Sequence, residues 1–311
     1  MTRRVLNRWW VKAAAQGVLA ATPGGGVLGD AVRRRLRGPA LAEDYFLSKW
    51  HHVEQHLRAL GNPGGVALRR TRAIEVGTGW FPIVPLGLAV HGGTVVTIDV
   101  GNHTDPQRVR LAMQVLSDLA ATGRIRVGSA DRLALLRTLL GSPTDTPAPD
   151  LLAPLGITLR IGDARDLAGM PETHGANLLV SNNTLEHIPA ETMRGIFEEF
   201  GRVGSGDARM SHYVDLADHY AGYDPRISEF HFLTLSPRRW RLANNRLGYQ
   251  NRLQLSDYHR LLAETGWRVT KETLTRRGRG DLDELRLVHP FTTMPVRELL
   301  VVKAHLVTRR A

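Results

Sequence analysis

The sequence predicts an α/β protein with a Rossmann-like, seven-stranded, mostly parallel sheet and helices on both faces. Short apolar, often β-branched runs alternate with helix-like segments after about residue 65, and such alternation is typical of parallel sheets built from crossover units. Several of these runs end at an acidic or amide residue. Because the carboxyl ends of parallel strands meet at one edge of a sheet, those side chains should gather where ligands bind.

The strands are expected where β-branched and apolar residues form short uninterrupted runs. Five such runs occupy residues 73–76, 94–98, 157–161, 176–180 and 209–214, and two more lie near 267–269 and at 300–307. Helices are expected at 82–91, 106–121, 190–203 and 256–265. Pro82 is tolerated in the first turn of its helix because the missing N–H would be unpaired there.

Residues 1–65 read as a basic helical N-terminal region that precedes the main domain at 66–311. Apolar spacing predicts an amphipathic helix over 3–20, which carries Trp9 and Trp10, and a short helix near 28–37. A further helix over 41–60 should share one apolar side, formed by Tyr45, Phe46, Trp50, Val53 and Leu57. These helices are expected to cover the ligand pocket or to contact a second copy or a partner subunit.

Charge and composition restrict the classes of function. The net charge is +11, and residues 1–40 hold eight basic residues against Asp30 alone. Two explanations of this excess stay open: a generally Arg-rich composition, or binding of an anionic partner. The chain has no cysteine, which excludes disulfides, thiolate catalysis and zinc–thiolate sites. No run is long and apolar enough for a membrane span or a secretory signal, so a cytoplasmic protein is expected.

The first strand runs into a glycine bend that indicates a nucleoside ligand. Gly77 and Gly79 let the backbone turn tightly and let a ligand approach closely. The third glycine of a dinucleotide fingerprint would fall at Pro82, so that motif is absent. Asp99 ends the next strand and can accept both hydroxyls of a ribose, while Glu75 can meet a cationic amine. This set matches an aminoacyl-nucleoside better than NAD.

At this point the chain resembles class I S-adenosylmethionine (SAM)-dependent methyltransferases of the bacterial small-molecule type. The matching segments are Glu75-Val76-Gly77-Thr78-Gly79, Thr97-Ile98-Asp99, Gly162-Asp163-Ala164 and Ser181-Asn182-Asn183-Thr184-Leu185-Glu186-His187-Ile188-Pro189. The resemblance implies SAM as cofactor, with the glycine bend and Thr78 around its methionine part. It further implies Asp99 on the ribose, Asp163 and Ala164 at the adenine, and Asn182 and Asn183 beside the methyl donor. The family's third glycine is Phe81 here.

The candidate catalytic residues are His219, Asp215 and His187. Asp215 ends the fifth strand, and His219 follows four residues later, so a carboxylate could orient an imidazole that acts as a general base. Structural roles for both histidines remain open. No metal is expected. His52 and His56 have a ligand spacing but read as two surface histidines, and Asp218 is expected to face solvent, although Asp215, Asp218 and His219 could hold a divalent ion.

Residues 216–255 read as a lid over the substrate pocket or as an insertion with its own small core. Its aromatic and Arg residues suit a planar or anionic small molecule. The predicted function is methyl transfer to an O or N atom of a small metabolite, of natural-product or sugar type. The alternatives are a lyase or cyclase with an anionic leaving group, a partner subunit, and a nucleic-acid methyltransferase. The last is disfavoured because the sequence after the fourth strand, 181–184, lacks the Asn/Asp-Pro-Pro-aromatic tetrapeptide.

Overall fold

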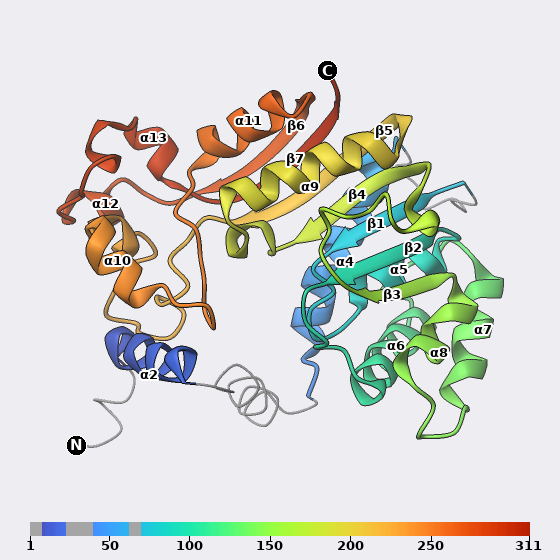
Figure 1. The fold of residues 1–311 in the computed structure, drawn as a ribbon. Helices are drawn as coiled ribbons and strands as arrows, with labels where there is room; N and C mark the ends of the chain where they lie inside the picture. Colours follow the sequence, from blue (N-terminus) through green and yellow to red (C-terminus); the bar gives the residue numbers. More distant parts are fainter. Residues whose placement is uncertain (1–7, 23–39, 62–69) are drawn as a thin grey trace, which may run out of the picture.

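One sheet of seven strands organises the chain in the order β3-β2-β1-β4-β5-β7-β6. The structure is a computed structural model that describes residues 8–22, 40–61 and 70–311 (Figure 1). Its strands are β1 (Arg72–Val76), β2 (Thr94–Asp99), β3 (Ile157–Ile161), β4 (Ala176–Asn182), β5 (Gly204–Asp215), β6 (Trp267–Arg276) and β7 (Val301–Arg310). The first five strands pair in parallel, and β7 is antiparallel to both β5 and β6. The predicted fold class is confirmed.

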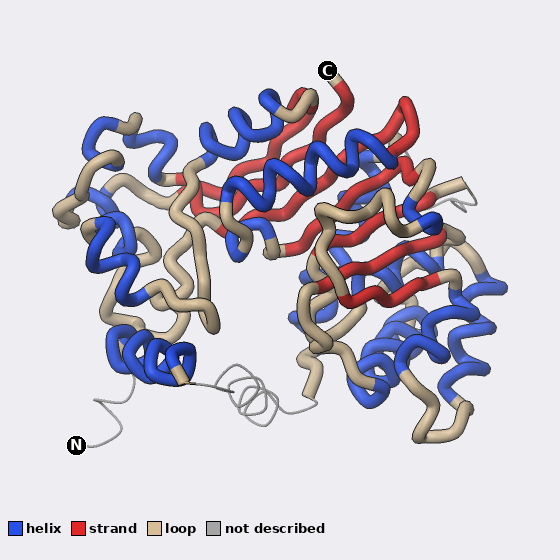
Figure 2. The backbone as a smooth tube through the Cα atoms, viewed as in Figure 1, coloured by secondary structure: helices blue, strands red, loops and turns tan. Residues whose placement is uncertain are grey.

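Helices cover both faces of the sheet (Figure 2). One hydrophobic core joins the sheet to α4 (Glu43–Ala59), α5 (Ile83–Val90), α6 (Pro106–Ala121), α7 (Ala130–Leu140) and α8 (Ala148–Leu152). A second core joins the opposite face to α9 (Ala190–Val203) and α11 (Leu255–Glu264). Because neighbouring side chains of a strand point to opposite faces, Ala73 enters the first core and Ile74 the second.

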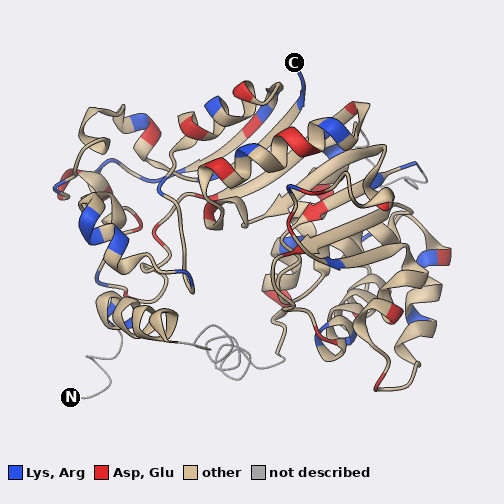
Figure 3. Ribbon diagram, viewed as in Figure 1, with Lys and Arg blue, Asp and Glu red and all other residues tan. Residues whose placement is uncertain are grey.

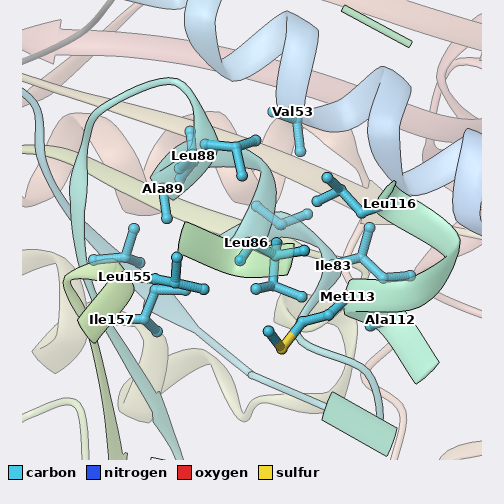
Figure 4. Close-up of a cluster of buried hydrophobic side chains, with 14 of the residues drawn as sticks. Val53, Ile83, Leu86, Leu88, Ala89, Ala112, Met113, Leu116, Leu155 and Ile157 are labelled. Carbon is cyan, nitrogen blue, oxygen red and sulfur yellow. The ribbon is translucent and has the colours of Figure 1, made fainter. Parts of the chain in front are cut away.

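The apolar side predicted for the helix over 41–60 is correct except at its first residue. Phe46, Trp50, Val53 and Leu57 are buried in the first core, where α4 lies against α5 (Figure 4). Tyr45 is 50% exposed. The side chains of 46, 50, 53 and 57 follow one stripe at helical spacing, and residue 45 precedes that stripe by one position, which rotates it toward solvent.

Three parts of the fold lie outside the predicted pattern. Helices α7 and α8 occupy the stretch after residue 121 that carries the loop signals Gly141-Ser142-Pro143 and Pro147-Ala148-Pro149. Strand β6 continues to Arg276, well past the expected 267–269. The connection to β7 contains the short helices α12 (Gly280–Asp283) and α13 (Val296–Leu299). A cap marks α7 in the sequence, because the Ser129 side chain accepts a hydrogen bond from the backbone N–H of Arg132.

A third core forms a separate lobe from the insertion after β5, helices α12 and α13, and α2 (Trp9–Ala21) (Figure 1). Buried Tyr220, Phe230, Phe232 and Trp240 fill this core together with α10 (Pro237–Ala243). The backbone N–H of Trp9 donates to the Asp224 carboxylate at 3.1 Å, which fastens α2 to the insertion. The insertion therefore shares a small core with α2, α12 and α13, and its role as a lid stays a prediction.

Acidic and basic residues alternate along most of the described chain (Figure 3). Most of the basic N-terminal residues, and the helix expected near 28–37, lie outside the described residues. Arg8 and Lys12 are described, and Lys12 lies over the rings of Tyr220 and Tyr223 at the start of the lobe. Within the described part of the chain, no helix is both long enough and apolar enough to cross a membrane.

The approach of α4 to α5 predicts a measurable clash. A methyl group added at Gly87 would lie 2.5 Å from Val53 Cγ2, so Gly87→Ala should lower the free energy of unfolding by about 1–3 kcal/mol through overpacking. The added methyl would fill the space that Val53→Ala opens. The double variant should therefore lose less free energy of unfolding than the sum of the losses of the two single variants. Gly201→Ala in α9 is the control: nothing lies within 4 Å, and it should stabilise by about 0.5–1 kcal/mol. Urea denaturation measures these free energies. If the losses of Gly87→Ala and Val53→Ala simply added in the double variant, this packing would be contradicted.

Candidate functional site

The glycine bend lies after β1, next to the point where the strand order reverses between β1 and β4. Gly77 and Gly79 both have positive φ, at +88° and +65°, a backbone region that glycine adopts without strain. The Gly77 N–H donates to the Ile98 carbonyl at 2.8 Å. A Cβ at Gly77 would lie 2.3 Å from Thr184 Oγ1. The bend therefore needs glycine both for its dihedral angles and for the close approach of Thr184.

Asp99 lies directly against this bend. Its two carboxylate oxygens accept hydrogen bonds from the backbone N–H groups of Gly79 and Gly101, each at 3.1 Å. Its side chain is only 12% exposed. The carboxylate is thus fixed in position at the end of β2, beside the glycine bend that is predicted to contact the ligand.

Asp163 and Ala164 follow β3, the next strand along the edge. The Gly162 N–H donates to the Asp99 carbonyl at 2.9 Å, which places the two strand ends side by side. The Asp163 carboxylate accepts from the Arg165 guanidinium, at 2.9 Å from Nε and 2.5 Å from Nη2, and this pairing lowers its pKa. Ala164 is buried in the second core. Asp163 therefore lies at the predicted edge but already has a cationic partner.

Glu75 is a buried carboxylate at the centre of the edge. It is 2% exposed, and its oxygens accept from Thr97 Oγ1 at 2.7 Å and from Asn182 Nδ2 at 3.2 Å. Burial raises the pKa of Glu75 to about 7, although both hydrogen bonds oppose the shift. Thr78 extends the contact, since its hydroxyl lies 2.6 Å from that of Thr97. The predicted cofactor residues of β1 and β4 are thus joined by one side-chain network.

The network continues from Asn182 through buried histidines. Asn182 Oδ1 lies 2.9 Å from His52 Nδ1 and 3.0 Å from His56 Nε2. An amide oxygen only accepts, so both ring nitrogens carry protons. His56 Nδ1 then accepts from Ser211 Oγ at 2.8 Å, and Ser211 Oγ accepts from His305 Nε2 at 2.8 Å. A single tautomer of each ring thus satisfies the chain of bonds, and it fixes the orientation of the Asn182 amide.

The prediction that His52 and His56 are surface histidines is wrong. His56 is fully buried, and burial lowers the pKa of both rings, that of His52 to about 3. The two rings are neutral network members because α4 packs across the ends of β4 and β5. His52 also stacks on the Tyr213 ring, with centroids 3.6 Å apart. Their position could not be read from helix spacing alone, because that spacing does not say which strand ends the helix covers.

Lys49 is a further member of the edge that the sequence reasoning missed. Its ammonium donates to Asn183 Oδ1 at 2.7 Å and to the Asn182 carbonyl at 3.4 Å. Asn183 has φ of +59°, the one non-glycine residue with positive φ in the described part of the chain, and asparagine tolerates this region better than most residues. The spacing of Lys49, His52 and His56 places them on one face of α4, which was the available signal.

The three predicted catalytic residues lie together beyond β4 and β5. His219 Nε2 is 3.9 Å from Asp215 Oδ2, and the His187 and His219 rings are 4.9 Å apart. Burial lowers the pKa of His219 to about 4 and raises the pKa of Asp215. His219 is therefore a neutral imidazole at physiological pH.

Asp218 is buried, so the prediction that it faces solvent is wrong. It is 2% exposed; Oδ1 accepts from the Tyr220 N–H at 2.8 Å, and Oδ2 lies 3.3 Å from His231 Nδ1. These bonds tie Asp218 to the core of the lobe. The combination of Asp215, Asp218 and His219 as an ion site is therefore disfavoured, because the Asp218 carboxylate is already bonded within the lobe.

A cavity of about 580 Å³ opens beside Asp215 and His219. Its wall contains apolar residues and charged ones, among them Glu229, Asp281, Arg277 and Lys303. The Arg277 guanidinium donates to both Glu229 oxygens, at 2.5 and 2.9 Å. Most of the aromatic residues expected in a lid fill the lobe core, although Phe230 also reaches the cavity wall. The cavity therefore offers both polar and apolar contacts to a small molecule, and most of its charged side chains are acidic.

Comparison with protein-family models gives no match, and comparison with curated proteins gives none either. Solved structures do resemble the chain. Magnesium protoporphyrin IX methyltransferase from Synechocystis, with bound SAH, shares 12% identity over 89% of this chain and 92% of its own, with a TM-score of 0.46. A TehB-like SAM-dependent methyltransferase from Corynebacterium glutamicum shares 10% identity over 86% and 98%, with a TM-score of 0.39.

Mitomycin 7-O-methyltransferase is a further similar structure, with 15% identity and a TM-score of 0.40. The similarity covers 78% of this chain but 49% of that one, so the present chain spans about half its length. At such identities these are similarities between folds.

Gly77 and Gly79 form a matched pair for testing the bend. Gly79→Ala adds strain alone, because nothing lies within 4 Å of its Cβ position, and positive φ costs about 1–3 kcal/mol. Gly77→Ala adds the collision with Thr184 and should destabilise by at least about 1 kcal/mol more. Chemical denaturation followed by circular dichroism measures both changes. Equal losses for the two variants would show that Thr184 does not press on the bend.

Proposed function

We propose that this chain is a class I SAM-dependent methyltransferase that methylates an O or N atom of a small metabolite. The observation that carries the proposal is the meeting of the Gly77–Gly79 bend with the carboxylates of Glu75 and Asp99 at the edge where the strand order reverses. Open parallel sheets bind ligands at this edge. A nucleoside with a cationic amino-acid tail needs a close backbone approach, a ribose acceptor and a nearby anion, and these residues supply all three.

Each predicted cofactor residue has a place in this proposal. The bend from Gly77 through Thr78 to Gly79 would hold the methionine part, and glycine at position 77 avoids the collision of a Cβ with Thr184. Asp99 would accept the ribose hydroxyls, and Asp163 and Ala164 would border the adenine. Asn182 and Asn183 would border the methyl donor. SAM supplies an activated methyl group, which the acceptor's lone pair takes while the C–S electrons stay on sulfur.

The acceptor would lie in the cavity that Asp215 and His219 line, with His187 next to His219. The protein's task there is to position the nucleophile and to receive its proton, because the donor is already activated. A neutral imidazole and a carboxylate of raised pKa supply groups that can receive it. The cavity wall carries the acids Asp215, Asp218, Glu229 and Asp281 against the bases Arg277 and Lys303, and this charged wall favours a substrate with polar groups over a purely aromatic one.

The features that suggested a non-methylating protein have structural explanations. Phe81 packs against the first hydrophobic core and so replaces the family's third glycine without filling the ligand edge. Two arginines of the 216–255 insertion are already engaged, since Arg226 pairs with Asp224 and Arg252 donates to backbone carbonyls of the lobe, which reduces their availability to stabilise a leaving anion. These contacts favour methyl transfer over lyase or cyclase chemistry for this site.

Calorimetric titration of the full chain with SAM tests the proposal directly. SAM should bind at one site per chain, and Asp99→Ala should raise Kd by about 10- to 100-fold, because hydrogen bonds to a charged acceptor contribute about 1.5–3 kcal/mol each. The control is Asp118→Ala, which removes an exposed carboxylate of α6 and should leave Kd unchanged. With a true substrate, the product should gain the mass of one CH₂ group. Equal Kd values for SAM in the parent chain and in Asp99→Ala would refute the assignment. So would a parent chain that does not bind SAM.

The raised pKa of Glu75 predicts a pH dependence of cofactor binding. Its ionised form dominates above about pH 7, and a cationic amine favours that form directly or through water. SAM binding should therefore tighten about fivefold from about pH 6 to about pH 7, where an α-amino group is still protonated. Glu75→Gln should flatten this profile. An unchanged slope in that variant would mean that another group controls the pH dependence.

A further inference from the structure

A buried acid and two imidazoles meet beside the acceptor cavity. Glu186 and His187 lie on a short 3₁₀ helix after β4 (Leu185–His187), and His219 approaches them from the lobe. One ligand atom from each of the three lies within 4.8 Å of the other two. We infer that Glu186, His187 and His219 bind a divalent first-row transition-metal ion.

Glu186 provides the first independent argument. It is 1% exposed, and neither carboxylate oxygen has a well-formed hydrogen bond among the described residues, although the backbone N–H groups of Glu186 and Asp215 lie near the carboxylate. Lys49 is close enough to influence it, but the Lys49 ammonium donates to Asn182 and Asn183 instead. A buried polar group without a partner is costly and calls for an explanation such as an ion. A metal ion next to His187 and His219 would supply the missing partner.

His187 provides the second argument. Its Nδ1 lies 2.7 Å from the Tyr249 carbonyl oxygen. A carbonyl only accepts, so Nδ1 carries the proton and Nε2 carries the lone pair. Metal-binding histidines commonly donate their second ring N–H to a backbone carbonyl, which fixes both tautomer and orientation. His187 is also exposed, so an ion can reach the cluster from solvent.

The donor set indicates the class of ion. Two imidazoles and one carboxylate suit zinc, cobalt, iron or nickel, whereas magnesium and calcium prefer all-oxygen sites. Three protein ligands leave coordination positions open, as catalytic sites do. His219 also lines the cavity, so those positions would be accessible to a molecule bound there.

The use of the ion rests on the proposed function. A metal-bound hydroxyl loses its proton more readily, so the acceptor atom would be a hydroxyl oxygen. The roles within the cluster then divide. Glu186, His187 and His219 would hold the ion, and Asp215, whose carboxylate lies 3.9 Å from His219 Nε2, would receive the proton of the acceptor hydroxyl.

Cobalt titration of the chelator-treated full chain, without SAM, tests the site. We expect one Co²⁺ per chain by calorimetry, visible d–d absorption from nitrogen ligation, and displacement by Zn²⁺. Glu186→Gln and His219→Gln should each raise the Kd for Co²⁺ at least about 10-fold, since loss of outer-shell partners alone costs 10- to 100-fold. Glu186→Gln keeps the side-chain volume and removes a buried acid, so its melting temperature should not fall.

His51→Gln is the matched control, because His51 is an exposed histidine of α4, and it should bind Co²⁺ as the parent chain does. The site is refuted if the parent chain shows no saturable binding, if Glu186→Gln binds as tightly as the parent, or if His51→Gln loses binding equally. If His219→Gln fails to fold, His187→Gln replaces it. SAM binding, measured separately, distinguishes the two proposals: a chain that binds SAM but no Co²⁺ loses only the metal site.

Discussion

The buried carboxylate of Glu75 is the constraint on which the ligand edge depends. A carboxylate removed from water needs partners, and here Thr97 and Asn182 supply them from the two strands that flank β1. These bonds tie the ends of β1, β2 and β4 together at the point where the strand order reverses. The glycine bend begins two residues later, so its backbone is held beside a fixed anion whose pKa lies close to physiological pH.

Helix α4, which precedes β1 in the chain, makes this arrangement possible because it packs beside the ends of β4 and β5. One of its faces packs into the first core through Phe46, Trp50 and Val53. A second face of α4 carries Lys49, His52 and His56. Lys49 donates to Asn183, and both histidines donate to the Asn182 side chain. Packing thus fixes the helix, and the helix fixes the amide that supports Glu75. The site depends on this helix as much as on the strand ends that follow it in the sequence.

The sequence was informative where a single strand or helix carries the signal. The β-branched runs form strands, and the glycine bend and the residues Asp99, Asp163, Asn182 and Asp215 lie at strand ends or directly after them, as expected. It was uninformative where partners come from distant segments. The burial of His56 and the role of Lys49 depend on how α4 crosses β4 and β5, and no local pattern encodes that crossing.

The lobe illustrates the same limit. Aromatic residues after β5 indicated a lid, but their burial depends on α2 from the N-terminus and on α12 and α13 from the connection before β7. Asp218 is buried there because Tyr220 and His231 surround it. Charge and exposure within such a lobe follow from contacts between segments that are more than 200 residues apart, as between Trp9 and Asp224.

A crystal structure of the full chain grown with SAH tests the central claim most directly. The account predicts a nucleoside whose ribose hydroxyls contact Asp99 and whose amino-acid tail follows the backbone from Gly77 to Gly79. Density for the ligand at any other part of the molecule, or an unoccupied edge at saturating SAH, would contradict it.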